Sequence, residues 1–251
     1  MRLNYTSRFW LYAPLILLAG LAVFVMGSWW TASQALDKKL TAANHHEIMP
    51  GITLSYGGKS ISGFPFRMDV VFDNLKLEGA GAHGPFVWTT EKFALHSLTY
   101  GRRQDIFEAA GEQSLSWHDA SGNAHAARFL PGTLHASAVI DGKGLSRFDL
   151  DMHAAAGDDF DAARMQLHLR RDPDGSDLDM VASADQFEKK GNPAFSVGNL
   201  RWSGTVSEAA ALMPLLAGQT TWPDGIAAWK AKGGMVRGNA TPAQSLLSAL
   251  Y

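Results

Sequence analysis

The chain has 251 residues, with 22 Lys or Arg against 24 Asp or Glu, so its formal net charge is -2. This balance argues against a nucleic-acid-binding protein, because such proteins gather basic residues on one surface. The chain contains no cysteine, which excludes disulfide frameworks, thiolate metal sites and cysteine nucleophiles.

The apolar stretch at residues 9–30 predicts a transmembrane helix. It carries no charged residue, and a helix of this length rises about 33 Å, close to the thickness of a hydrocarbon core. Aromatic residues stand at both ends, as expected where a helix meets the two membrane interfaces. Arg2 and Arg8 precede the stretch, so the positive-inside rule places residues 1–8 in the cytoplasm and the rest of the chain across the membrane.

A cleaved signal peptide is the alternative to an anchor. Residues Ser33 to Ala35 fit a small-x-small cleavage site. The apolar stretch is longer than the usual core of a signal peptide, which favours the uncleaved anchor. Both interpretations place the main domain outside the cytoplasm.

Residues 31–50 continue at helical spacing and predict a short stalk that ends at Pro50 and Gly51. From residue 51 to residue 251 apolar and polar residues alternate, and segments rich in Gly, Asp and Asn separate the runs. One-sided alternation of this kind is typical of antiparallel sheets. We therefore predict a mainly β protein with one N-terminal transmembrane helix and a long, curved antiparallel β-meander.

The segment 61–79, ISGFPFRMDVVFDNLKLEG, is the first long strand of this pattern. The alternation changes parity at Asn74, which predicts a β-bulge or a tight turn. The sequence leaves open whether the apolar side of the sheet closes into a core or lines a groove. The candidates to face a lipid or to form that core are Phe64, Phe66, Met68, Val70, Phe72, Phe148, Leu150, Met152, Leu167 and Leu169.

Three short helical patterns follow the strands, at residues 207–218, 224–234 and 241–251. Thr241 is the expected N-cap of the third helix, with Pro242 at its first position. This pattern is unfinished at Tyr251, so we expect either a truncated chain or a C-terminal helix that docks on the sheet.

Two acidic patterns contain residue types that bind metal ions. Asp149, Asp151 and His153 share one face of a predicted strand, an arrangement that suits a divalent cation. Asp172, Asp174, Asp177 and Asp179 have a spacing faintly like that of a calcium loop. The solvated face of a strand explains the first pattern better, and a β-turn explains the second better.

Motifs of catalysis are missing from the sequence. No Ser lies in a Gly-x-Ser-x-Gly elbow, and YGGKS at residues 56–60 lacks the first glycine of a phosphate loop. We therefore expect no catalytic residue, no metal and no cofactor, and we predict that the protein is not an enzyme.

The motif GFPFR, Gly63 to Arg67, enters an alternating strand some thirty residues after a single N-terminal membrane helix. With the glycine-rich β-meander, it resembles the bacterial envelope family known as domain of unknown function 2125, over the chain from the end of the membrane stretch onward. That family carries no established activity. Its organisation is similar to that of AsmA-like envelope proteins, which have one inner-membrane anchor and a curved β-groove associated with lipid transport or outer-membrane assembly.

This resemblance implies a single-pass protein of the bacterial inner membrane with its main domain in the periplasm. We expect it to bind a lipid or acyl chain along a curved β-sheet groove without catalysis. The alternative is an assembly scaffold that holds another envelope protein through a sheet edge or the C-terminal helix.

Overall fold

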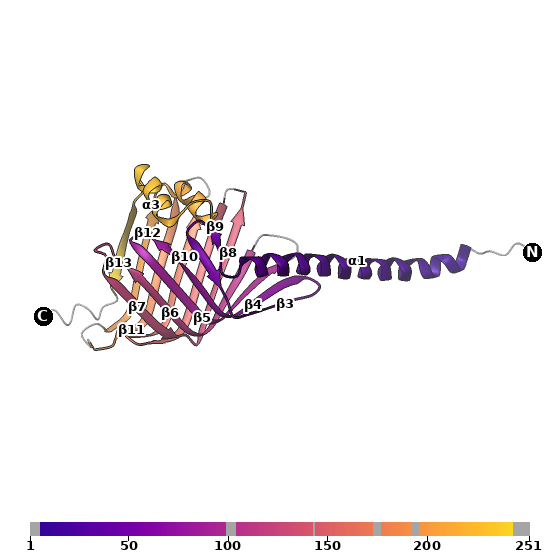
Figure 1. Ribbon diagram of the computed structural model, residues 1–251, viewed down its shortest axis with the longest axis horizontal. Coiled ribbons are helices and arrows are strands. Elements are labelled where there is room, and N and C mark those ends of the chain that lie inside the picture. Colours follow the sequence, from indigo (N-terminus) through magenta and orange to yellow (C-terminus); the bar gives the residue numbers. More distant parts are fainter. Residues whose placement is uncertain (1–5, 99–103, 143, 173–176, 192–195, 243–251) are drawn as a thin grey trace, which may run out of the picture.

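The fold is one curled antiparallel sheet preceded by a long helix (Figure 1). A computed structural model of the protein describes residues 6–98, 104–142, 144–172, 177–191 and 196–242. Helix α1 (Thr6–Ala43) begins the described chain, and short helices lie near its other end. This arrangement confirms the predicted mainly β fold.

Thirteen strands of the described chain join in a single sheet. Their bounds are β1 (His46–Met49), β2 (Ile52–Ser55), β3 (Gly58–Ser62), β4 (Arg67–Gly81), β5 (Gly84–Leu98), β6 (Gln104–His118), β7 (Ala124–Leu130), β8 (Thr133–Asp141), β9 (Gly144–Gly157), β10 (Phe160–Arg171), β11 (Leu178–Lys189), β12 (Ser196–Val206) and β13 (Val236–Pro242). Neighbours in sequence are mostly neighbours in the sheet, as in a meander, and β7 and β8 together form one interrupted strand beside β6 and β9.

The predicted stalk is shorter than residues 31–50. Helix α1 ends at Ala43, and residues 46–49 form strand β1. The backbone of His45 is left-handed, with φ 62°, a conformation that stops a helix. The Asn44 amide then pairs with both backbone groups of Tyr56, at 2.9 and 3.2 Å. These two bonds fasten the end of α1 to the sheet.

The sheet curls so that the early strands cross in front of the later ones (Figure 1). Its strand register places the apolar side chains on one side, which we call the inner face. One row of directly paired residues crosses this face from β4 to β12. The row consists of Val70, Leu95, Phe107, Ala136, Leu150, Leu167, Ala182 and Trp202.

A line of irregular residues, which we call the crease, crosses the same strands. Asn74, Gly111, Ala154 and Gln186 lie on this line with φ between 49° and 80°, and each is left out of the strand pairing at its position. Of these four positions only Gly111 lies at a shift of register, where β6 carries an extra residue opposite β5, as in a β-bulge. The change of parity predicted at Asn74 is present, since Val70, Phe72 and Leu75 are all buried, but β4 and β5 keep one register on both sides of Asn74, so the expected extra residue is not there.

Helices η2 (Ala209–Leu212), α2 (Met213–Leu216) and α3 (Trp222–Ala231) connect β12 to β13 along one border of the sheet (Figure 1). The buried Trp229 of α3 donates its indole N–H to the Ser207 carbonyl, at 2.7 Å. The predicted start of the third helix is wrong, because Pro242, expected at its first position, pairs with Leu200 in β13. Residues 243–251 lie outside the described residues.

Candidate functional site

The candidate site is an apolar groove between α1 and the inner face of the sheet. Its volume is about 440 Å³. Its walls come from α1, β4, β5 and the start of β6, and consist of Ala32, Leu36, Leu40, Met68, Val70, Phe72, Leu95, Ser97, Leu98 and Asp105. A concave, mostly apolar surface with few polar groups is the usual form of a site for an apolar ligand.

Helix α1 is held over this groove by specific contacts. Leu36 and Leu40 pack against the buried cluster of Leu54, Tyr56, Val70, Phe72 and Leu75. The Tyr56 hydroxyl donates to the Leu40 carbonyl at 2.8 Å, near the end of the helix where carbonyls lack helical partners. Lys59 forms an ion pair with Asp37. The groove therefore has a fixed helical wall.

The inner face does not close into one core. A second buried cluster, Met152, Ala155 and Ala162, lies on β9 and β10. Between the two clusters, Leu95, Phe107 and Ala136 are only half-buried. Because a packed protein interior leaves few apolar side chains partly exposed, this part of the inner face is less tightly packed than the two clusters.

Eight of the ten predicted residues lie on this inner face. Met68, Val70 and Phe72 line the groove itself. The other five lie on β9 and β10, where Phe148 pairs with Leu169, Leu150 pairs with Leu167, and Met152 pairs with Met165. These five continue the inner face beyond the groove.

Phe64 and Phe66 are not part of the sheet, contrary to the expected strand. β4 begins at Arg67, and residues 63–66 form a turn in which the Arg67 N–H donates to the Gly63 carbonyl at 2.9 Å. The turn packs against α1, where the Trp29 indole donates to the Arg67 carbonyl at 3.0 Å. The Trp29 ring meets Phe64 edge-on, with 5.6 Å between centroids. Pro65 fixes its own φ and lacks a donor, which suits a turn before a strand.

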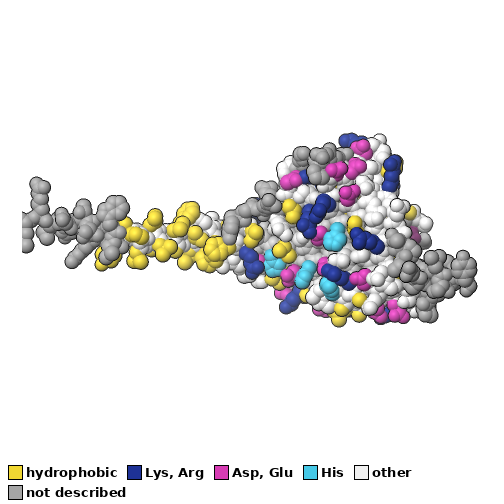
Figure 2. All heavy atoms as spheres, turned by 180° about the vertical axis from the view of Figure 1, so that it is seen from behind, with side chains coloured by type: hydrophobic (Ala, Val, Ile, Leu, Met, Phe, Trp, Pro, Cys, Tyr) yellow, Lys and Arg dark blue, Asp and Glu magenta, His cyan; other side chains and the backbone are white. Residues whose placement is uncertain are grey.

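The opposite, outer face of the sheet carries paired charges (Figure 2). Arg164 donates to both carboxylate oxygens of Asp151, at 2.8 and 2.6 Å. This hydrogen bonding holds the pKa of Asp151 below its usual value. Burial alone would raise the pKa of Asp149, but hydrogen bonds with His168 and Arg147 outweigh it and lower that pKa as well.

The acidic patterns considered as metal sites are engaged in other contacts. Asp149, Asp151 and His153 share the outer face, as predicted, yet both carboxylates pair with arginines. Asp177 accepts a hydrogen bond from the Glu208 N–H at 3.1 Å, and Asp174 lies outside the described residues. Among the residues that the structure describes, no three His, Cys, Asp or Glu side chains group closely enough to hold a metal ion.

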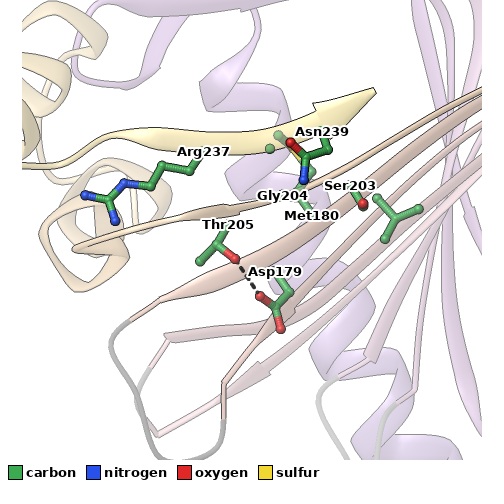
Figure 3. A pocket seen from close by; sticks show the side chains of 9 residues that line it. Asp179, Met180, Ser203, Gly204, Thr205, Arg237 and Asn239 are labelled. Atoms are coloured by element: carbon green, nitrogen blue, oxygen red, sulfur yellow. Dashed lines mark hydrogen bonds between the residues drawn. The ribbon is translucent and has the colours of Figure 1, made fainter. Parts of the chain in front are cut away.

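A polar hollow of about 670 Å³ lies at the far border of the sheet (Figure 3). Strands β11, β12 and β13 line it. Thr205 donates to Asp179 across β12 and β11, at 3.0 Å, and Figure 3 shows Arg237 extending away from this pair. Its open, mixed surface offers no converging set of reactive groups.

Sequence reasoning missed the helical wall of the groove. Ala32, Leu36 and Leu40 recur every four residues, which places them on one side of a helix. That spacing was the available signal. It indicated a stalk, but it did not indicate that the stalk folds against β4 and β5.

The fold and the groove define a class of protein: a curled antiparallel β domain on one N-terminal apolar helix. By length and composition, residues Tyr12–Ala43 include a segment able to cross a membrane, a test that a signal sequence near the N-terminus also passes. The chain belongs to the family described as an uncharacterized protein conserved in bacteria (DUF2125), whose sequence model matches residues 29–244. Comparison with curated proteins and with solved structures found no match.

Proposed function

We propose that the protein is an anchored, non-catalytic protein of the bacterial cell envelope that binds a lipid acyl chain in the groove under α1. In this proposal α1 stays in the inner membrane with its N-terminus in the cytoplasm, and the β domain lies in the periplasm. The basic residues before the apolar segment support this orientation, and the Trp pair marks the interface at its other end.

The row of apolar residues across the inner face carries the proposal. It begins in the groove at the buried Val70 and continues through the half-buried Leu95 and Phe107 to Leu150. Burial of apolar surface is worth about 25 cal/mol per Å², so an acyl chain laid along this row would be stabilised without any polar contact. The fixed helical wall keeps the groove in place for the chain.

Photo-crosslinking at neighbouring positions of β5 tests the proposal. p-Benzoylphenylalanine in place of Leu95 would face the groove, whereas the same residue in place of Ala94 would face the outer side. We expect lipid adducts, identified by mass spectrometry, at position 95 and few at position 94. A folded protein with no adduct at 95, or with equal yields at both positions, would contradict lipid binding.

A scaffold function is the second candidate, favoured by the exposed border strand β13. Residues 236–240 are exposed, and within the described chain β13 pairs only with β12. Such a border can accept a strand of a partner protein. Photo-crosslinking at Arg237 in cells should then trap one discrete envelope protein, and Gly198, exposed inside β12, is the matched control.

A further inference from the structure

The turn at residues 63–66 lies against the membrane segment and not at a free end of the domain. Pro65 and Phe66 share a hollow of about 490 Å³ with Phe24, Val25 and Trp29 of α1. Ala32 lines both this hollow and the groove under α1. The two apolar spaces therefore adjoin along one side of the helix.

The position of these contacts along α1 sets the depth of the turn. Phe24 and Val25 precede Trp30 by six and five residues, which places them about 8–9 Å further into the apolar segment at 1.5 Å per residue. Trp residues at the end of such a segment mark the membrane interface. A turn that shares a hollow with Phe24 and Val25 thus faces the level of the acyl chains.

The side chains of the turn suit that depth. Phe64 is 49% exposed and Phe66 is 58% exposed, although both are large aromatic groups. The exposed guanidinium of Arg67 comes next and lies 3.2 Å from Asp69. A pair of aromatic rings followed by a basic residue is the arrangement of a segment that dips into lipid and places its charge among the headgroups.

We propose that Phe64, Pro65 and Phe66 insert among the acyl chains of the leaflet nearest the β domain, as a second membrane contact beside α1. The contact fixes the tilt of the domain and holds the opening of the groove at the lipid surface. Insertion itself depends only on α1 spanning the membrane. The transfer of a chain past Ala32 into the groove rests on the proposed function.

Single cysteines test the insertion directly, because the chain has none of its own. Phe66→Cys and Leu130→Cys place an NBD label at sites that are 58% and 54% exposed. Leu130 lies at the end of β7, where it pairs with Ala156 of β9. Leu17→Cys labels the middle of the apolar segment. The full chain is reconstituted in vesicles of phosphatidylethanolamine and phosphatidylglycerol that contain nitroxide-labelled lipid.

We expect lipid nitroxides to quench the label at position 66 several-fold more strongly than the label at 130, with blue-shifted emission at 66. Strong quenching at 17 with equal, weak quenching at 66 and 130 would overturn the insertion. Weak quenching at 17 would also overturn it, because α1 would then not span the membrane. Quenching at 66 without lipid adducts at Leu95 would leave the insertion standing and refute the proposed lipid binding.

Discussion

Single residues on the crease show how backbone conformation shapes this sheet. Gly111 has φ 80°, and a Cβ built on it would lie 2.7 Å from the Glu91 Cβ of the neighbouring strand. A side chain there meets both a strained backbone and a crowded neighbour. Gly122, in the β6–β7 turn, has φ 82° with no atom within 4 Å of a built Cβ.

Gly111→Ala should therefore destabilise the protein more than Gly122→Ala. The left-handed backbone alone costs an alanine about 1–2 kcal/mol, and this cost applies to both variants. Crowding against Glu91 should add about 1 kcal/mol or more at position 111. Urea unfolding in detergent, followed by circular dichroism, measures the difference. Equal losses would show that Glu91 moves aside freely.

The lowered pKa of Asp151 predicts that the stability of the fold depends on pH. Because its pKa is lowered in the folded state by Arg164, the carboxylate stabilises the fold above the unfolded pKa of about 3.9. This contribution is lost as the pH falls through the lower folded pKa. Wild type should exceed Asp151→Asn in unfolding free energy by about 0.5–1 kcal/mol at pH 7, the range of exposed ion pairs.

Thermal unfolding at pH 7 and at progressively lower pH measures this gap, which should close in acid. Asp159→Asn, on the exposed β9–β10 turn, changes the same functional group without removing an arginine pair. A gap for Asp151→Asn that stayed constant from neutral to strongly acidic pH would contradict an electrostatic origin.

At the scale of elements, the end of α1 is fastened to the sheet by Tyr56. Tyr56→Phe removes the hydroxyl that donates to the Leu40 carbonyl and should cost about 1 kcal/mol of unfolding free energy. Tyr12→Phe, at an exposed site on α1, makes the same chemical change and should have little effect. Chemical unfolding in detergent compares the two. If Tyr56→Phe lost no more unfolding free energy than Tyr12→Phe, Leu36 and Leu40 would hold the helix without this hydrogen bond.

Much of each element was predictable from local patterns, and their assembly was not. Alternation placed Met68, Val70 and Phe72 on one side of a strand, because side chains of a strand point to opposite faces in turn. The true end of α1 depended on the Asn44–Tyr56 pairing, which joins residues twelve positions apart. Thr241 had the composition of a helix cap, but pairing with β12 decided its conformation.

At the scale of the whole molecule, the row of apolar residues makes the inner face continuous from β4 to β12. Leu150 lies in the middle of the row that begins in the groove. If an acyl chain follows that row, Leu150→Glu should block it, because a charge cannot be buried beside the chain without a large free-energy cost. A photo-crosslinker at Leu167 should then form no lipid adducts, while adducts at Leu95 remain. Ser203→Glu puts the same charge on the exposed opposite side of β12 and should change neither yield. Adducts at both positions in Leu150→Glu would show that the chain stops within the groove.

The crease also changes which positions of a strand tolerate change. Inward residues of β4 are even-numbered at Val70 and Phe72 and odd-numbered at Leu75. β9 shifts in the same way between Met152 and Ala155. In a saturation scan of β4 or β9, the positions that tolerate polar residues should therefore be odd-numbered on one side of the crease and even-numbered on the other, or the reverse. A comparison of relatives that assumed a fixed two-residue period would assign the residues on one side of the crease to the wrong face of the sheet.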